Sequence, residues 1–321
     1  MQAYKYTLPT IACLIGLFIT ATAPAQYNWG NQDIDNVKYQ PEISISVGGT
    51  NFLGDLGGKP GVGGPFIKDF LFKTVRPYVG ASVGWNPENW YSIFAGAGFT
   101  VVNGADSLIN NKGGQERWRV YRNNSFRSNI YELSLTGELR LLTLLDPTHS
   151  VHRFSPYLGL GVGMFHFNPQ VPLDGKWIYV RPLHLEGQGF AEYPDRKEYK
   201  LNQFYIPVSL GVKYYTNNRM ALSVSALFRK TFTDYIDDVS TSYIDPKLFN
   251  KYLTPENALL ARQLYSRSIR PDKVRPNVGK GDPSDMDNYV SVVFTLSFIL
   301  KGPDAVYYPG RPSRDWSPRR P

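Results

Sequence analysis

The chain contains eight segments in which apolar residues alternate with smaller or more polar ones, and the last segment shows this most clearly. In the stretch NYVSVVFTLSFILKG, residues 288–302, every second residue from Val290 to Leu300 is apolar. A period of two indicates a β-strand with two unlike faces. The other seven segments that show this pattern span residues 42–52, 74–85, 91–102, 129–141, 156–167, 204–215 and 220–231.

The connections between these strands alternate in length. Residues 86–89 and 216–219 are tight turns rich in Asn, and residues 146–155 form a modest loop. The remaining connections are long: 53–73, 103–128, 168–203 and 232–287. An even number of strands with this one-sided asymmetry is typical of outer-membrane barrels. We therefore predict an all-β fold, an eight-stranded antiparallel transmembrane β-barrel with long extracellular loops and short periplasmic turns.

The alternation also assigns the two faces of the barrel wall. The apolar face meets outer-membrane lipid, and the other face lines a lumen that side chains largely fill in a barrel of this size. Charged residues at inward positions predict a lumenal ion-pair network, made of Arg76, Glu132, Glu138, Arg140, Lys213 and Arg229. Aromatic residues beside the short turns predict a girdle at the periplasmic membrane surface, made of Trp85, Trp90, Tyr91, Tyr214 and Tyr215.

Pro207 interrupts the strand over residues 204–215 and removes one hydrogen bond from the ladder. It lies near the end of that strand that adjoins a long loop. We therefore expect a β-bulge at the barrel rim at this position.

The N-terminal residues have the pattern of a cleaved secretory signal. Lys5 precedes an apolar run, and the small residues Ala23-Pro24-Ala25 follow it. An uncleaved anchor helix is the alternative. We predict a signal peptide (1–25), an N-terminal periplasmic segment (26–41), the barrel (42–301) and a basic, Pro-rich periplasmic tail (302–321). Side chains of the tail are candidates for docking a periplasmic partner: Arg311, Arg314, Trp316, Arg319 and Arg320.

Composition narrows the classes of function. Cys13 is the single cysteine and lies inside the predicted signal, so the mature chain has no disulfide, thiolate metal site or cysteine nucleophile. Lys and Arg total 35 against 27 Asp and Glu, a formal net charge of +8. In an exported protein this excess favours anionic lipid headgroups and periplasmic partners over nucleic acid.

The sequence offers little catalytic chemistry. It lacks the motifs of nucleophile elbows, zinc proteases and phosphate-binding loops, and we expect no cofactor and no enzyme activity. His166, near the outer rim, is the one candidate for a lipid-modifying site. The stretch TDYIDDVSTSYIDP, residues 233–246, holds weak candidates for a calcium site, Asp234, Asp237 and Asp238, although their spacing is not that of an EF-hand. Ion pairing with Arg229 or Lys230 is the alternative.

Two helix starts follow that acidic stretch. Asp245-Pro246 and Thr254-Pro255 each place a capping residue before a proline at the first helical position. Residues 258–267 then have the pattern of a short amphipathic helix. The fourth long loop is therefore expected to be partly folded.

Three stretches resemble a known family: GGTNFLGDLGG (48–58), YIPVSLGVKYY (205–215) and DYIDDVSTSYIDP (234–246). They are similar to the PorG-like outer-membrane barrels of the type IX secretion system, and the resemblance runs from about residue 39 to 301. It implies a non-enzymatic component of a protein secretion machinery that associates with a periplasmic ring of PorK-like and PorN-like proteins. Two alternatives remain: a surface barrel whose long loops bind a ligand or partner and, more remotely, a lipid-modifying enzyme.

Overall fold

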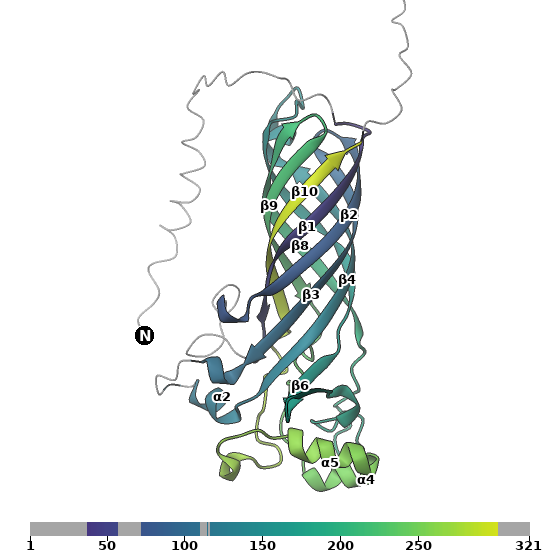
Figure 1. The fold of residues 1–321 in the computed structure, drawn as a ribbon. Helices are drawn as coiled ribbons and strands as arrows, with labels where there is room; N and C mark the ends of the chain where they lie inside the picture. The colour runs from purple at the N-terminus through teal and green to yellow at the C-terminus, as the bar shows by residue number, and fades with distance from the viewer. Residues whose placement is uncertain (1–36, 57–71, 110–113, 115, 301–321) are drawn as a thin grey trace, which may run out of the picture. The chain divides into compact units, whose positions relative to one another are not determined.

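The structure is a computed structural model that describes residues 37–56, 72–109, 114 and 116–300. All of these residues belong to the compact unit that begins at residue 34. Within them, ten strands form one sheet, and eight of the ten close into an antiparallel barrel (Figure 1). The barrel strands are, in order around the wall, β1 (Pro41–Leu53), β2 (Arg76–Glu88), β3 (Tyr91–Ala105), β4 (Ser125–Arg140), β5 (Phe154–His166), β8 (Asn202–Asn217), β9 (Met220–Thr231) and β10 (Asn288–Ile299).

The predicted fold is therefore confirmed, and the closing strand is the alternating segment near the C-terminus. β10 pairs with β1 over twelve residue pairs. On the inner side of this seam, hydroxyl groups face each other across the two strands and hydrogen bond at 2.7–2.9 Å. Such cross-strand pairs satisfy polar groups that the barrel has removed from water. The pairs are Ser44 with Ser297, Ser46 with Thr295, and Thr50 with Ser291.

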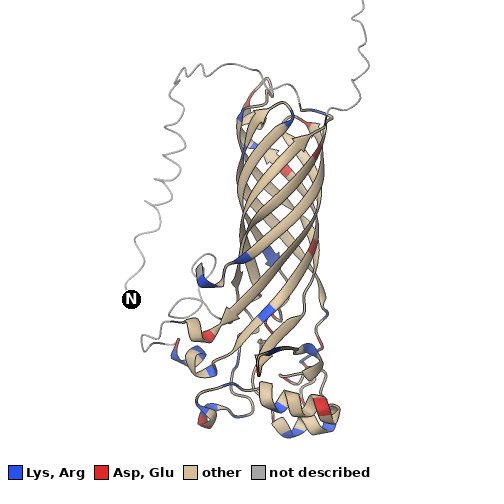
Figure 2. Cartoon of the chain, in the orientation of Figure 1, with Lys and Arg blue, Asp and Glu red and all other residues tan. Residues whose placement is uncertain are grey.

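The outer wall is apolar on every strand. Many outward-pointing apolar side chains are exposed, and several are more than half exposed, among them Ile45 on β1, Leu133 on β4, Leu160 on β5, Leu210 on β8 and Phe294 on β10. Figure 2 shows that Lys, Arg, Asp and Glu gather mainly at the two ends, while the wall between them is nearly free of charge. This is the wall of a barrel that spans a membrane with its strands.

Pro207 causes no bulge, so that expectation is wrong. β8 stays in register with β9 through Pro207, which pairs with Arg229. The ladder with β5 is interrupted beside Pro207 and resumes in the same register, with Leu160 opposite Val208 and Gly163 opposite Tyr205. The missing N–H of Pro207 therefore causes no shift in the register of β8 with β5 or β9. The register shifts in the described part of the barrel lie instead beside the short turns, between Trp85 and Glu88 in the β2–β3 pair and between Tyr215 and Asn217 in the β8–β9 pair.

The structure also differs from the predicted aromatic girdle at one residue, Tyr215. Trp85 and Tyr214 point outward and are 49% and 43% exposed, as a girdle requires. Tyr215 is fully buried, because the alternation of β8 turns it inward. It packs with Val37 and Ile299 in a small apolar cluster at the short-turn end of the barrel.

The described parts of the four long connections lie at one end of the barrel and form a cap. They contain the hairpin β6 (Pro169–Leu173) and β7 (Lys176–Tyr179) and the helices α2 (Arg117–Arg122), α4 (Phe249–Tyr252) and α5 (Pro255–Leu264), with short 3-10 turns between. The expected helix starts are confirmed: the side chain of Asp245 accepts from the backbone N–H of Lys247, and that of Thr254 from Asn257.

The cap has its own apolar core. Residues from the third and fourth loops pack together there: Val171, Val180, Leu183, Leu185, Phe190, Ile244, Phe249, Ala258, Ala261 and Leu264. At the opposite end, α3 (Leu141–Leu145) is a five-residue turn that follows β4 directly. In the described part of the chain, no helix has the length and apolar character needed to cross a membrane.

Candidate functional site

The lumen is blocked toward the cap by a buried ion pair. The guanidinium of Arg229 on β9 donates to a carboxylate oxygen of Glu132 on β4 at 2.7 Å. Arg229 also donates to the hydroxyl of Ser291, and its guanidinium lies 5.0 Å from the ring centres of Tyr78 and Tyr289. The hydroxyl of Tyr289 donates to the second oxygen of Glu132 at 3.0 Å. Both charges are therefore paired with each other and lie beside the rings of Tyr78 and Tyr289.

A second group of charges lies toward the short turns. The ammonium of Lys213 on β8 is 2.9 Å from Glu42 on β1 and 3.5 Å from Glu138 on β4. Lys213 and Glu42 are both nearly fully buried, at 3% and 1% exposed. Arg140 lies close by and donates to the side chains of Asn86 and Ser92.

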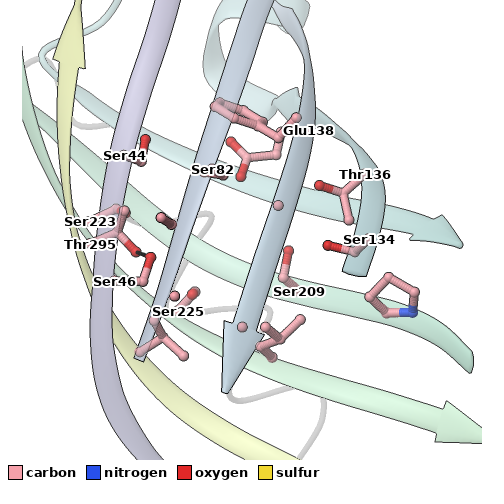
Figure 3. A pocket seen from close by; sticks show the side chains of 18 of the residues that line it. Ser44, Ser46, Ser82, Ser134, Thr136, Glu138, Ser209, Ser223, Ser225 and Thr295 are labelled. Carbon is pink, nitrogen blue, oxygen red and sulfur yellow. Dashed lines mark hydrogen bonds between the residues drawn. The ribbon is translucent and has the colours of Figure 1, made fainter. Parts of the chain in front are cut away.

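Between the two groups lies a small cavity in the lumen. Its volume is about 120 Å³, and hydroxyl groups and glycines line most of it. Figure 3 shows hydroxyl side chains from several strands converging on this space: Ser44, Ser46, Ser82, Ser134, Thr136, Ser209, Ser223, Ser225 and Thr295. Such a cavity has room and partners for a few waters. Ion pairs flank this cavity on both sides.

Arg76 lies apart from these groups. Its guanidinium donates to the backbone carbonyls of Val75 and Lys73 at the start of β2. Among the described residues, the carboxylates within ion-pair distance of a lumenal cation are Glu42, Glu132 and Glu138. The structure thus brings five of the six predicted residues into the lumenal groups and adds Glu42, which the sequence pattern missed.

Between Arg229 and the cap, a cluster of aromatic side chains fills the mouth of the barrel. Phe52, Phe126, Phe165, Phe167 and Tyr205 are all at most 5% exposed and belong to one cluster. Tyr199 stacks on both Phe167 and Tyr235, which joins the third and fourth loops to this core. The mouth is therefore closed by packing as well as by charge.

Arg122 of α2 connects three loops in the cap by hydrogen bonds. Its guanidinium donates to both carboxylate oxygens of Asp106 at 2.8 Å. It also donates to the backbone carbonyls of Asp55 in the first loop and Lys280 in the fourth. Arg122 is 8% exposed and Asp106 is fully buried. The bidentate geometry fixes both partners in orientation as well as distance.

Glu186 joins the third loop to the fourth. Its carboxylate accepts from the backbone N–H groups of Ser240 and Thr241 at 2.8–3.3 Å, and from the hydroxyl of Thr241. The ammonium of Lys280 lies 3.3 Å from the same carboxylate, and both groups are buried. Sequence analysis missed Arg122 and Glu186 because their partners lie 16 to 158 residues away and no local motif marks them.

The predicted calcium candidates are buried in this cap and do not form a metal site. Asp234, Asp237 and Asp238 are 4% exposed or less. Within the described ranges, no three side chains of His, Cys, Asp or Glu come together in a way that could hold a metal ion. Burial raises the pKa of Asp234 to about 9, with the charge of Asp237 adding to the shift, and raises the pKa of Asp238 to about 7. Burial therefore disfavours the ionised form of these carboxyl groups.

The remaining candidates lie elsewhere. The ring of His166 at the end of β5 shares a hydrogen bond of 2.8 Å with the side-chain carbonyl of Asn202 and is exposed. The predicted docking residues of the tail, Arg311 to Arg320, lie outside the described residues.

Comparison with known proteins gives a family and a fold. The family model described as Domain of unknown function (DUF6089) matches residues 34–248, which covers the barrel through β9 and the start of the fourth loop. No curated protein matches the sequence.

Solved barrels resemble this chain only distantly in sequence. One is Ail, the attachment invasion locus protein of Yersinia pestis, in complex with the heparin analogue sucrose octasulfate (7% identity, 82% of this chain and 99% of Ail, TM-score 0.36). Others are Neisserial surface protein A (8% identity, 81% and 97%, TM-score 0.36) and the outer membrane protein OprG from Pseudomonas aeruginosa (12% identity, 84% and 100%, TM-score 0.33). These similarities concern the barrel fold alone. By the family match, which spans most of its length, the chain belongs to the DUF6089 family.

Proposed function

We propose that this protein is a non-enzymatic outer-membrane component of a type IX-like protein secretion machinery and that it associates with a periplasmic ring of PorK-like and PorN-like proteins. The observation that carries the proposal is the pair of ionic contacts across the lumen. Arg229–Glu132 and Lys213–Glu42 span the interior at two levels, and we infer that they leave cargo no path through it. A barrel that does not conduct cargo would act through the partners that bind at its two ends.

The outer membrane is the location that the wall supports best. The apolar outer face, the strand count and the predicted signal over residues 1–25 agree with export to that membrane. The short turns then face the periplasm and the cap faces outward, with the tail on the periplasmic side.

The periplasmic end offers an apolar surface for a partner. On α3, Leu142, Leu144 and Leu145 are 41%, 37% and 78% exposed. Asp146 ends this turn by accepting from the backbone N–H and hydroxyl of Thr148, which fixes the chain direction after it. Exposed leucines on an ordered turn are typical of contact surfaces. The predicted tail would add a second contact.

Affinity purification of the full chain from native membranes tests the proposal. We expect the periplasmic ring proteins to co-purify, and we expect less of them with Leu145→Asp or with a chain cut after Gly302. Leu259→Asp, on the exposed side of α5 in the cap, is the matched control and should leave the association unchanged. Heat-modifiable gel mobility shows that each variant still contains a folded barrel. Ring-free preparations of the full chain would contradict the proposal.

A surface barrel that binds a ligand through its loops is the second candidate. The observation in its favour is the separate core of the cap, which is more structure than four connecting loops need. A molecule that co-purifies with the full chain and is lost when residues 169–199 are replaced by a short turn would favour this alternative.

A further inference from the structure

The cap buries many more acidic groups than basic ones. Seven carboxyl groups from all four loops lie in or beside one region under its surface: Asp55, Asp106, Glu186, Asp234, Asp237, Asp238 and Asp287. Two buried cations, Arg122 and Lys280, face them. Arg122 is engaged by Asp106, and Lys280 lies against Glu186. The remaining carboxyl groups have no cation of their own in the described part of the chain.

Several oxygens of these acids have no donor. Both carboxylate oxygens of Asp234, and one each of Asp237, Asp238 and Asp287, are buried and lack a hydrogen bond of normal geometry among the described residues, although the hydroxyl of Ser240 lies beside Asp234. Their other oxygens are engaged: Asp237 accepts from the backbone of Val239 at 2.9 Å, Asp287 from Ile236 at 2.8 Å, and Asp238 from the hydroxyl of Tyr199 at 2.7 Å. An ionised carboxylate without donors is too costly to bury.

Protons and a bound cation are the two ways to remove that cost. Five orphan oxygens would suit a cation if they converged, but no three acidic side chains among the described residues do so. A proton needs only one carboxyl group and one neighbouring oxygen. The arrangement of Asp234, Asp237 and Asp287 therefore fits protonated acids better than metal ligands.

We propose that protons on Asp234, Asp237 and Asp287 hold the four long loops together and that the cap opens as the pH rises. This inference concerns the long-loop end and does not depend on the secretion role. Asp234 and Asp237 lie at the start of the fourth loop, and Asp287 closes that loop by accepting from Ile236 before β10 begins. Ionising them places like charges where the ends of the loop meet.

Neighbouring groups from every loop affect the equilibrium between the protonated and ionised forms of the three acids. The first loop contributes Asp55, which accepts from the backbone of Asp282, and the second contributes Arg122 and Asp106. The third contributes Glu186 and Tyr199. The fourth contributes Tyr235, Tyr243, Lys280 and the outer acids Asp282 and Asp285. The carboxylates among these groups oppose ionisation of the three acids, whereas Arg122 favours ionisation of Asp237.

The sign of the pH effect follows from burial. Burial first, and then neighbouring carboxylates, raise the pKa of Asp234 to about 9 and hold the pKa values of Asp237 and Asp287 well above the ordinary value of 3.8. In an opened cap these acids return toward 3.8. Their contribution to closure is therefore complete below about pH 4 and is lost as the pH rises through the raised values.

Hydrogen–deuterium exchange of the full-length protein in lipid vesicles tests the proposal. We expect the protection of residues 233–287, corrected for intrinsic exchange, to fall between pH 6 and pH 9 by about tenfold per pH unit for each acid that ionises on opening. The double variant Asp234→Asn, Asp287→Asn keeps neutral side chains of similar shape. It should flatten the profile and be better protected than the wild type at pH 9.

Asp195→Asn, at an exposed acid of the third loop, is the matched control and should follow the wild-type profile. The wild-type profile alone decides the matter if the double variant does not fold. Protection that stays constant from pH 6 to pH 9 would overturn the proposal. So would protection at pH 9 that millimolar calcium restores, since a metal ion would then be the resident counter-charge.

Discussion

Arg229 and Glu132 form their 2.7 Å ion pair across the lumen and not along the wall. Arg229 lies on β9 and Glu132 on β4, and β8 and β5 separate those strands in the sheet. Lys213 on β8 reaches Glu42 on β1 in the same way, past β9 and β10. The two pairs therefore act as struts that cross the interior between strands that are not neighbours in the sheet.

Removing one partner of the Arg229–Glu132 pair should lower the free energy of unfolding of the barrel. Arg229→Gln leaves the Glu132 carboxylate buried without its cation, so we expect the free energy of unfolding to fall by about 3–5 kcal/mol. Urea titration of the protein in lipid vesicles measures this change. The double variant Arg229→Met, Glu132→Met should recover most of the loss, because no charge is then left unpaired.

Arg76→Gln is the control for that series. Its side chain bonds to backbone carbonyls at the rim, so we expect a change within about 0.5 kcal/mol. Equal losses at positions 76 and 229 would contradict the view that the strut is the stabilising element.

The outer face of β10 should not tolerate charge. Leu296 points outward, and Leu296→Arg would place a guanidinium in the hydrocarbon region at a cost of about 2–4 kcal/mol near the bilayer midplane. Leu259→Arg, on an exposed position of the cap, is the matched control. Vesicle unfolding measures both variants, and similar losses at the two positions would argue against a lipid-facing wall.

The orientation in the membrane can be read with epitope tags. A tag inserted at Gly175, in the exposed turn of the β6–β7 hairpin, should be reachable by antibody on intact cells. A tag at Asn217, in the short turn between β8 and β9, should become reachable only after the outer membrane is opened. The opposite labelling would place the cap in the periplasm and remove the basis for the proposed contact at α3.

The wall was predictable from the sequence because its information is local. Alternation alone locates all eight barrel strands to within a few residues, and it assigns Glu132, Glu138, Arg140, Lys213 and Arg229 to the inside. Alternation fails at strand ends. Arg76 has an inward position but lies at the rim, where backbone carbonyls compete for it. Glu42 was not predicted because it is the second residue of β1, directly after Pro41, where the alternating pattern has barely begun.

The cap was predictable only in fragments. The helix starts at Asp245 and Thr254 are local capping signals, and both are present in the structure. The acidic stretch around Asp234 carries no local sign of burial. Its environment comes from Glu186, Tyr199 and Arg122 in other loops, and such long-range contacts leave no periodic pattern in the chain.

Conductance of the purified full-length protein in a planar lipid bilayer tests directly whether the lumen is sealed. We expect no stepwise ion currents at neutral pH, because the two ion pairs and the packed aromatic mouth leave a cavity of only about 120 Å³. Steady, reproducible single-channel openings in the wild-type protein would contradict it.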